Sequence, residues 1–245
     1  MVCRIEQSEQ QPEANAPAPA PQRVTYREYS PEGGVAEAPL AAEIALAITY
    51  NGLSQAVMMV SPGNLEDFIR GFSITNDIVS DLSEIYDIRL SHFPQACQAD
   101  VQISSRAFWA LKDHRRQMAG TSGCGLCGVE ALEQALPQLQ SLEPSPLPPA
   151  EHLQGLRERI EQAQHMARSS GALHAALYVD EQGEVRLCQE DIGRHNALDK
   201  LIGALLNAGI DGRQGFTVVT SRCSLELIHK AVRARLGTLV SLSAP

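Results

Sequence analysis

The sequence has 245 residues, of which 44% are hydrophobic, a size that suits one large domain or two small ones with a true core. Its formal net charge of −9 argues against binding nucleic acid over a broad surface, which usually leaves a basic footprint. The N-terminus has no basic stretch followed by an apolar one, and no apolar run approaches the roughly 18 residues of a membrane span. These features predict a soluble cytoplasmic protein that binds neither nucleic acid nor membrane.

Two proline-rich segments divide the chain. Residues 1–22 are rich in Gln, Glu, Ala and Pro and have few large apolar side chains, which predicts a disordered tail. Residues 137–149, PQLQSLEPSPLPP, have the composition of a semi-extended linker. We therefore expect an N-terminal lobe over 23–136 and a C-terminal lobe over 150–245.

The N-terminal lobe begins with a predicted β-hairpin. Strands Ile44–Tyr50 and Leu53–Val60 flank Asn51-Gly52, which suits the positive φ angles of a two-residue type I′ turn. Ser61-Pro62 then supplies a helix cap and a first-turn proline. Apolar residues at helical spacing follow: Leu65, Phe68, Ile69 and Phe72. Two strands and a basic helix complete this α+β lobe, at Glu84–Leu90, Asp100–Ser104 and Arg106–Met118.

The C-terminal lobe shows alternating strand and helix patterns. The predicted elements in chain order are a helix near 151–169, strands Leu173–Val179 and Glu184–Gln189, a helix at 195–208, strand Phe216–Thr220, helix Leu225–Arg235 and strand Thr238–Leu242. Strand–helix–strand order with short connections predicts parallel pairing and an α/β layer.

Two of the six cysteines lie close together in the sequence. Cys124 and Cys127 occupy a glycine-rich stretch, TSGCGLCG, whereas the other four cysteines are scattered, unlike a secreted disulfide framework. Helical spacing after this loop, together with Arg115 and Arg116 upstream, would favour a thiolate or persulfide anion. The arrangement suits a sulfur shuttle, in which one cysteine holds the extra sulfur and its neighbour assists release by exchange.

Three other interpretations of the cysteine pair stay open at this level. A structural zinc site needs four ligands, and no second CxxC or paired His stands at the usual spacing, although Cys188, Cys223 and several histidines could converge in space. A thioredoxin-like dithiol would follow the first strand of a βαβ unit, whereas this pair follows a basic helix. The pair could also be incidental.

A second cluster of polar residues joins a predicted strand to a helix. The segment Glu190–Lys200, EDIGRHNALDK, places Arg194, His195 and Asn196 in the first helical turn. Cations there are unfavourable beside the positive end of the helix dipole, unless an anion such as phosphate binds the same terminus. The alternative is an ordinary helix start with solvated charges.

A similar turn, Thr220–Ser224, contains Ser221 and Arg222 and offers Ser221 or Ser224 as a helix cap. In an α/β layer the two turns would meet at the carboxyl ends of the strands, where open sheets usually bind ligands. Cys223 is expected to be a buried small hydrophobe. Three histidines are expected to be structural or surface residues: His165, His174 and His229.

Several long segments resemble the formate dehydrogenase accessory (FdhD) family, in order along residues 23–245. They are Ala56–Met59, Leu65–Ile74, Ser122–Gly128, Glu190–Lys200 and Thr220–Leu227 with Lys230. The resemblance implies a sulfur carrier that accepts sulfur from a cysteine desulfurase and passes it to the bis-molybdopterin guanine dinucleotide cofactor before that cofactor enters formate dehydrogenase. Cys124 would carry the persulfide, with Cys127 as its partner.

The resemblance also implies a fold, a ligand site and an assembly. The C-terminal lobe would be a cytidine-deaminase-like α/β domain beside the smaller α+β lobe, in a protein that is generally a homodimer. A pocket for the guanine nucleotide end of the cofactor, which GDP would mimic, is expected to include Arg194, His195, Asn196, Ser221 and Arg222. No permanently bound cofactor or metal is expected.

Two details of the sequence refine what the resemblance implies. Zinc deaminases need His-x-Glu and Pro-Cys-x-x-Cys, but none of the seven histidines has Glu two residues later and Gly123 precedes Cys124, so deamination is excluded. Members of the family normally continue through another helix, a strand and a Gly-Arg segment linked to cofactor binding, whereas this chain stops at Ser243–Pro245. Either the sequence is truncated, or the protein has lost part of that site, so the resemblance supports the sulfur-carrier role more strongly than cofactor binding.

Overall fold

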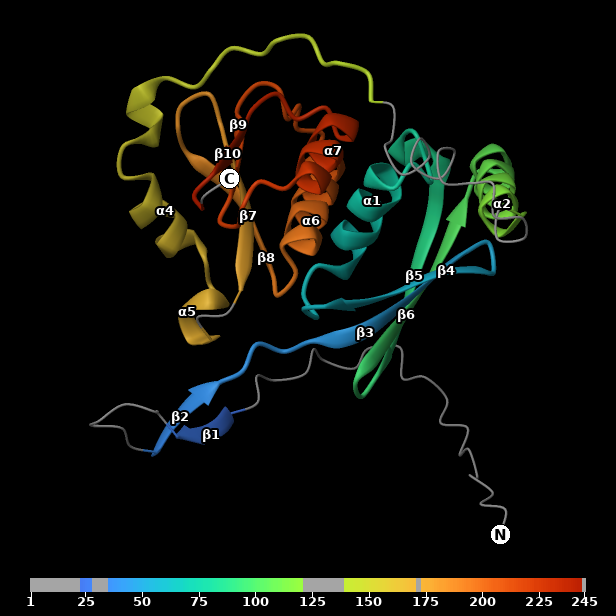
Figure 1. The fold of residues 1–245 in the computed structure, drawn as a ribbon, viewed down its shortest axis with the longest axis horizontal. Coiled ribbons are helices and arrows are strands. Elements are labelled where there is room, and N and C mark those ends of the chain that lie inside the picture. Colours follow the sequence, from blue (N-terminus) through green and yellow to red (C-terminus); the bar gives the residue numbers. More distant parts are fainter. Residues whose placement is uncertain (1–22, 28–34, 121–138, 171–172, 244–245) are drawn as a thin grey trace.

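The computed structural model describes four ranges of the chain: residues 23–27, 35–120, 139–170 and 173–243. Within them the chain forms a mixed α/β structure around two four-stranded mixed sheets. The two sheets stand apart, with helices packed between them and outside them (Figure 1). The predicted tail over 1–22 lies outside the described residues.

The N-terminal lobe contains one of the two sheets. Its strands are β3 (Ile44–Tyr50), β4 (Leu53–Val60), β5 (Ile85–Phe93) and β6 (Ala96–Ile103), in the order β4-β3-β6-β5. β3 pairs antiparallel with β4 and parallel with β6, and β5 pairs antiparallel with β6. Its helices are α1 (Leu65–Thr75), the 3₁₀ helix η1 (Leu82–Glu84) and α2 (Ser105–Gly120). One apolar core joins the inner face of this sheet to α1 and α2.

The predicted hairpin is confirmed in both strands and in its turn. Asn51 and Gly52 have φ angles of 47° and 79°, in the left-handed region that a type I′ turn requires. Asn51 also ties the hairpin to β6, because its amide nitrogen donates to the carbonyl of Ile103 at 3.0 Å and its amide oxygen accepts from the backbone N–H of Ile103 at 2.8 Å. The turn thus helps to fix the register of the sheet.

The predicted capping of the first helix by Ser61 is wrong. Helix α1 begins after Asn64, whose φ is 55° and whose side chain makes no capping hydrogen bond. Ser61 is fully buried just after β4, and its Oγ accepts a hydrogen bond from the backbone N–H of Ile192 in the other lobe at 3.1 Å. A tertiary contact therefore uses the hydroxyl that the local sequence assigns to the helix cap.

The C-terminal lobe contains the second sheet. Its elements are the 3₁₀ helix η3 (Ala150–Leu153), α4 (Leu156–Ala163), α5 (Ala167–Ser170), β7 (His174–Val179), β8 (Val185–Asp191), α6 (Arg194–Asn207), β9 (Phe216–Val219), α7 (Leu225–Arg233) and β10 (Leu239–Ser241). One apolar cluster fills the space between the sheet and the pair α6 and α7, and a second lies between the sheet and α4.

The prediction of parallel pairing in this sheet is only partly correct. The order is β10-β9-β7-β8, and β9 with β10 forms a parallel pair. β7 pairs antiparallel with both β8 and β9. The short turn at Gly183, which has a φ of 83°, folds β8 back on β7 as a hairpin, and α6 then crosses over to place β9 on the other side. β8, β9 and β10 therefore run in one direction, with β7 opposed between them.

The predicted single helix at 151–169 is wrong, because the segment breaks into η3, α4 and α5. Gly155 has a φ of 61°, a left-handed conformation that ends the first piece and precedes α4. Gln164, with extended backbone, ends α4. Leu156 and Ile160 of α4 are buried against the outer face of the sheet.

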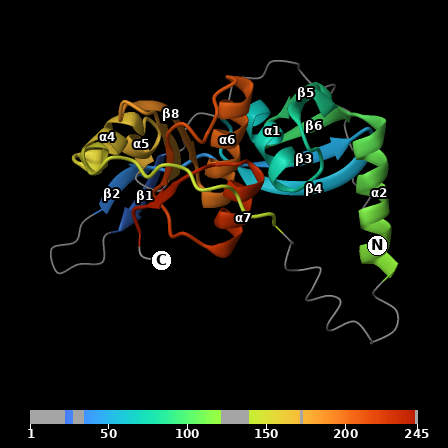
Figure 2. The same cartoon turned by 90° about the horizontal axis from the view of Figure 1, so that it is seen from above.

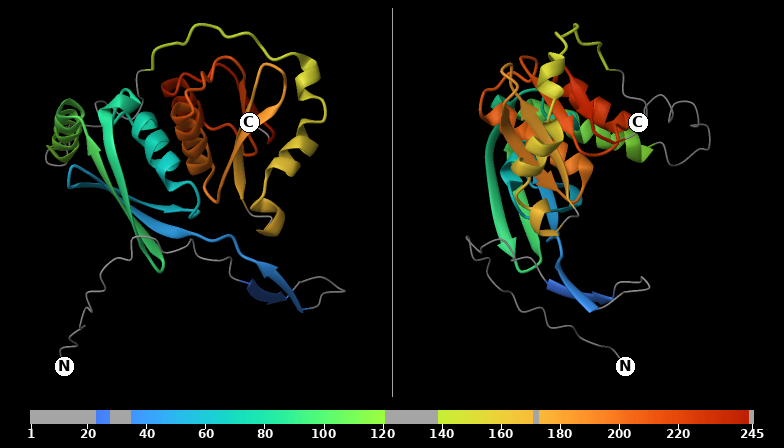
Figure 3. Two further views of the ribbon diagram at one scale, coloured as in Figure 1. Left: turned by 180° about the vertical axis from the view of Figure 1, so that it is seen from behind. Right: turned by 90° about the vertical axis from the view of Figure 1, so that its left-hand side faces the viewer.

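A separate two-stranded arm precedes the N-terminal sheet and was not anticipated from the sequence. β1 (Arg23–Arg27) and β2 (Val35–Pro39) pair antiparallel. The arm projects from the body below α5, and the chain passes from β2 directly towards β3 (Figures 1 and 3). The described part of the predicted linker, residues 139–149, has no helix or strand and runs from the N-terminal lobe to η3.

The two lobes meet along α1 and α6, which lie side by side between the sheets (Figure 2). Their backbones approach closely at Gly71 and Gly203. A Cβ atom on Gly71 would lie 1.8 Å from the carbonyl oxygen of Asp199, and one on Gly203 would lie 1.8 Å from that of Asp67. Only glycine can occupy these two positions without moving one helix away from the other.

Replacing Gly203 with alanine should therefore destabilise the protein by about 3 kcal/mol, because the new methyl group overlaps the α1 backbone and outweighs the gain in helix propensity. Denaturant unfolding measures the difference. Gly63→Ala is the matched control, since a Cβ there meets nothing within 4 Å. Equal effects of the two substitutions would show that the helices tolerate a wider spacing.

Candidate functional site

The carboxyl ends of three strands of the C-terminal sheet lie at one edge. β8 ends at Asp191, which pairs with His174, and the ends of β9 and β10 pair with each other at Val219 and Ser241. Helices α6 and α7 begin at this edge, and neither receives a side-chain cap. The two polar turns thus lie at one edge, as the sequence predicts, and the first-turn N–H groups of both helices have no side-chain acceptor within the described ranges.

Arg194 and His195 form the first turn of α6 and are both half-buried. The Arg194 guanidinium makes no hydrogen bond or ion pair with any residue that the structure describes. His195 Nε2 lies 3.0 Å from Oε2 of Glu226, which is on the first turn of α7. Burial lowers the pKa of His195, while Glu226 opposes this shift and Arg194 adds to it. At neutral pH this imidazole is therefore mostly uncharged.

His174, expected from the sequence to be structural, belongs to the same edge. It begins β7, opposite Asp191 in the register. Burial lowers the pKa of His174, and the neighbouring charge of Arg194 lowers it further. Only the pairing of β7 with β8 brings His174 to Arg194, so no local pattern in the sequence could have identified it.

The second turn contributes one exposed cation. Arg222 is exposed, and its guanidinium has no hydrogen-bond or ion-pair partner among the described residues. Ser221 is buried, its Oγ donating to the carbonyl of Arg222 at 3.2 Å and its own carbonyl accepting from Ser241 Oγ at 2.7 Å. Ser224 Oγ is buried without a hydrogen-bond partner in the described structure. Ser221 thus shapes the turn, and Arg222 extends from it.

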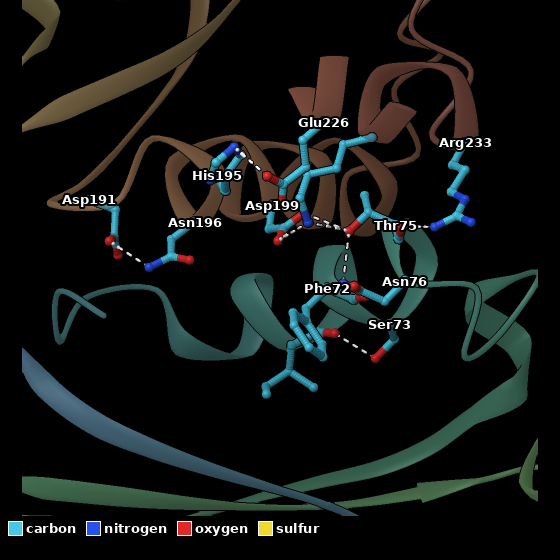
Figure 4. A network of polar contacts seen from close by, with 12 residues as sticks. Phe72, Ser73, Thr75, Asn76, Asp191, His195, Asn196, Asp199, Glu226 and Arg233 are labelled. Atoms are coloured by element: carbon cyan, nitrogen blue, oxygen red, sulfur yellow. Dashed lines mark hydrogen bonds and ion pairs between the residues drawn. The ribbon is translucent and has the colours of Figure 1, made fainter. Parts of the chain in front are cut away.

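Asn196 points away from the edge and into the lobe interface. Its amide nitrogen donates to the carbonyl of Met59 at 2.8 Å and to Oδ1 of Asp191 at 3.0 Å. Figure 4 shows the Asn196 amide and the Asp191 carboxylate facing each other beside α6. These contacts hold the backbone of the turn in place. Asn196 can therefore contribute to ligand binding only indirectly.

A buried ion pair connects α6, α7 and α1 further along the interface. Lys230 Nζ lies 2.8 Å from Oδ2 of Asp199 and 3.1 Å from Oγ1 of Thr75, which itself donates to Asp199 at 2.7 Å. Arg233 donates to the carbonyl of Thr75 at 2.6 Å. Figure 4 shows Asp199 and Arg233 reaching towards Thr75 from the two C-terminal helices. This cluster, which the sequence did not reveal, ties the end of α1 to the C-terminal lobe.

The predicted sulfur-carrying residues Cys124 and Cys127 lie outside the described residues. The cysteines that the structure does describe are free thiols: Cys97, Cys188 and Cys223. Burial raises the pKa of Cys97 to about 11 and that of Cys188 to about 12, so both remain protonated at neutral pH. No group of three metal-ligating side chains occurs in the described ranges.

The edge as described can recognise an anion. Where β8, β9 and β10 end, the edge carries two half-buried imidazoles, two helix starts without a side-chain cap, and two guanidinium groups that have no partner among the described residues. Guanidinium groups bind phosphate through paired hydrogen bonds, and helix N-termini add N–H donors. The fold and this edge together define a two-lobed α/β protein with a candidate phosphate-binding site.

Comparison with known proteins identifies the class. The profile of the FdhD/NarQ family matches residues 41–245. A "Sulfur carrier protein FdhD" from Bordetella petrii is 44% identical over 208 residues, 84% of this chain and 74% of that protein. Another from Cupriavidus necator is 41% identical over 206 residues, 84% of this chain and 72% of that protein. The chain belongs to the FdhD/NarQ family.

A solved structure supports the fold. The crystal structure of a protein from Desulfotalea psychrophila, described as a formate dehydrogenase accessory protein, matches with a TM-score of 0.68. It covers 93% of this chain and 85% of the other, at 22% identity, which supports the fold alone. Across the described ranges, no helix is both long enough and apolar enough to cross a membrane.

Proposed function

We propose that this chain is a sulfur carrier that serves formate dehydrogenase. The observation that carries the proposal is the identity of 41–44% to proteins named as sulfur carriers, along 84% of the chain. The CxxC loop supplies the chemistry. The Cys124 thiolate attacks the terminal sulfur of a desulfurase persulfide, so that a persulfide forms on Cys124 and the desulfurase thiolate leaves.

Release of the sulfur involves the second cysteine. The Cys127 thiolate attacks the inner sulfur of the Cys124 persulfide, which releases hydrosulfide and leaves a Cys124–Cys127 disulfide for a cellular thiol to reduce. The acceptor in this proposal is the bis-molybdopterin guanine dinucleotide cofactor, which later enters formate dehydrogenase. The proposal also includes a cytoplasmic homodimer and a cytidine-deaminase-like fold for the C-terminal lobe.

The edge of the C-terminal sheet is the proposed site for the guanine nucleotide end of that cofactor. Arg194 and Arg222 would bind the phosphates, and His195 would add a hydrogen bond and, when protonated, a charge. Ser221 and Asn196 hold the two turns through the contacts described above. This assignment is supported by two arginines and two helix starts at one edge, whose guanidinium and N–H groups have no side-chain partner among the described residues.

Replacing Arg194 with alanine should weaken GDP binding by about tenfold or more, because a charge-assisted contact to phosphate is lost. Titration calorimetry measures the affinity. In the free protein, burial lowers the pKa of His174 and that of His195. A bound phosphate would raise both pKa values, because its negative charge favours the protonated imidazole. The affinity for GDP should therefore rise as the pH falls.

Arg89→Ala is the matched control, because Arg89 is an exposed arginine paired with Asp87 on β5 in the other lobe. Its loss should leave GDP affinity unchanged. Equal affinities for the Arg194 variant and the unmodified protein would remove Arg194 from the site, and an affinity independent of pH would remove both histidines.

A further inference from the structure

The Asp191 carboxylate is a buried acceptor for donors from both lobes. Asp191 has no exposed surface, and its Oδ2 lies 2.9 Å from the backbone N–H of Ser61 and 2.8 Å from Lys200 Nζ. Its Oδ1 accepts from the backbone N–H of Gly193 at 2.8 Å and from the amide of Asn196 at 3.0 Å. One side chain thus connects the end of β4, the turn before α6 and α6 itself.

Further hydrogen bonds run beside the carboxylate between the same segments. Lys200 Nζ donates to the carbonyl oxygens of Ser61 at 2.9 Å and Glu190 at 3.3 Å. Ser61 Oγ accepts from the backbone N–H of Ile192 at 3.1 Å. Asp191 and Ile192 are therefore bonded directly to Ser61 of the N-terminal lobe, and Lys200 links Glu190 to the same residue.

The turn also packs tightly on this network. A Cβ atom at Gly193 would lie 2.7 Å from Asn196 Nδ2 and 3.4 Å from Asp191 Oδ1, so only glycine fits there without displacing the amide. The next two side chains, Arg194 and His195, are not used by the network. The carboxylate fixes the backbone, and the two side chains remain available for a ligand.

We propose that Asp191 is the positioning residue of the phosphate-binding edge: it sets where Arg194 and His195 stand without touching the ligand. This inference rests on the proposed nucleotide site. It makes the geometry of that site depend on the N-terminal lobe, since Ser61 of that lobe is one of the donors to Asp191. Misplacing a binding group by about an ångström is enough to lose most of its contribution.

The structure offers a matched control for testing Asp191. Asp199 forms a second buried Asp–Lys pair at the lobe interface, with Lys230 at 2.8 Å and with Thr75 of the N-terminal lobe, but accepts from no backbone N–H of the turn. Asp191→Asn and Asp199→Asn each remove one buried carboxylate charge beside a lysine. Both should lower Tm, whereas only Asp191→Asn should weaken GDP binding, by at least about tenfold.

A second readout needs no ligand. The ring proton resonances of His195 and His174, followed against pH, report how close the two imidazoles lie to the Arg194 guanidinium. The Asp191 charge itself raises the pKa of His174, so His195, whose pKa has no direct contribution from Asp191, is the readout for this variant. Asp191→Asn should shift the His195 titration, and Asp199→Asn should leave that of His174 unchanged. Should Asp191→Asn fail to fold, Ser61→Ala removes the acceptor for Ile192 and Thr75→Val removes the corresponding hydroxyl beside Asp199. The first should weaken GDP binding about threefold and the second should not.

The outcomes separate the two proposals. Equal loss of GDP affinity in the two aspartate variants, or no loss and no shift of the His195 titration in Asp191→Asn, would overturn the positioning role and leave Asp191 as a link between lobes. If the unmodified protein binds no GDP, the nucleotide site itself fails, and the His195 titration alone decides whether Asp191 positions the turn.

Discussion

Replacing Cys124 with alanine is expected to abolish sulfur loading and to leave the unfolding temperature within about a degree of the original. Without the Cys124 thiolate there is no nucleophile at this position to accept sulfur from a desulfurase persulfide. The fold should persist, because each lobe has an apolar core among the residues that the structure describes. Intact mass after incubation with a cysteine desulfurase and cysteine measures the loading.

Cys223→Ala serves as the control, because Cys223 is a half-buried free thiol at the edge of the C-terminal sheet. This variant should load one sulfur, as the unmodified protein does. Loss of bound zinc and unfolding in the Cys124 variant would favour the structural-zinc interpretation, and full loading of that variant would move the carrier function to another cysteine.

Replacing Lys230 with methionine should cost about 3–5 kcal/mol of folding stability, the typical effect of leaving a buried charge without its partner. The Asp199 carboxylate is fully enclosed, and burial raises its pKa while Lys230 holds it down. In the variant Asp199 must either stay charged without its cation or take up a proton. Denaturant unfolding at neutral pH measures the loss.

Two further variants sharpen this test. Lys112→Met removes a lysine that lies over the rings of Phe108 and Trp109 on α2, and should change stability by no more than about 1 kcal/mol. Combining Lys230→Met with Asp199→Leu removes both charges and should recover part of the loss. A small effect of Lys230→Met alone would mean that water reaches the lobe interface.

Elements with a local signature could be predicted from the sequence. Asn51-Gly52 specifies its hairpin because the turn needs two positive φ angles, and the apolar period of Leu65–Phe72 marks one face of α1. The prediction for Ser61 failed because a contact distant in sequence decided it, whereas the prediction of one helix at 151–169 missed a local feature of the segment. Ser61 bonds to the C-terminal lobe, and Gly155 breaks the helix.

The candidate site shows the same division. The helix-start position of Arg194 and His195 follows from the sequence, and the turns do meet at one strand edge. The inward direction of Asn196 and the presence of His174 depend on strand register and lobe packing, which no window of sequence contains. The sequence shows which residue types are present, and the tertiary structure decides which of them are left free.

The central claim is that Cys124 carries sulfur as a persulfide, and the most direct measurement is mass mapping of the loaded protein. After incubation with a cysteine desulfurase and cysteine, one added sulfur should be found on the peptide containing Cys124 and should disappear on treatment with a reductant. Cys97 and Cys188 should remain unmodified, because burial raises the pKa of both thiols. An added sulfur on Cys188 or Cys223, or none anywhere in the protein, would contradict the account.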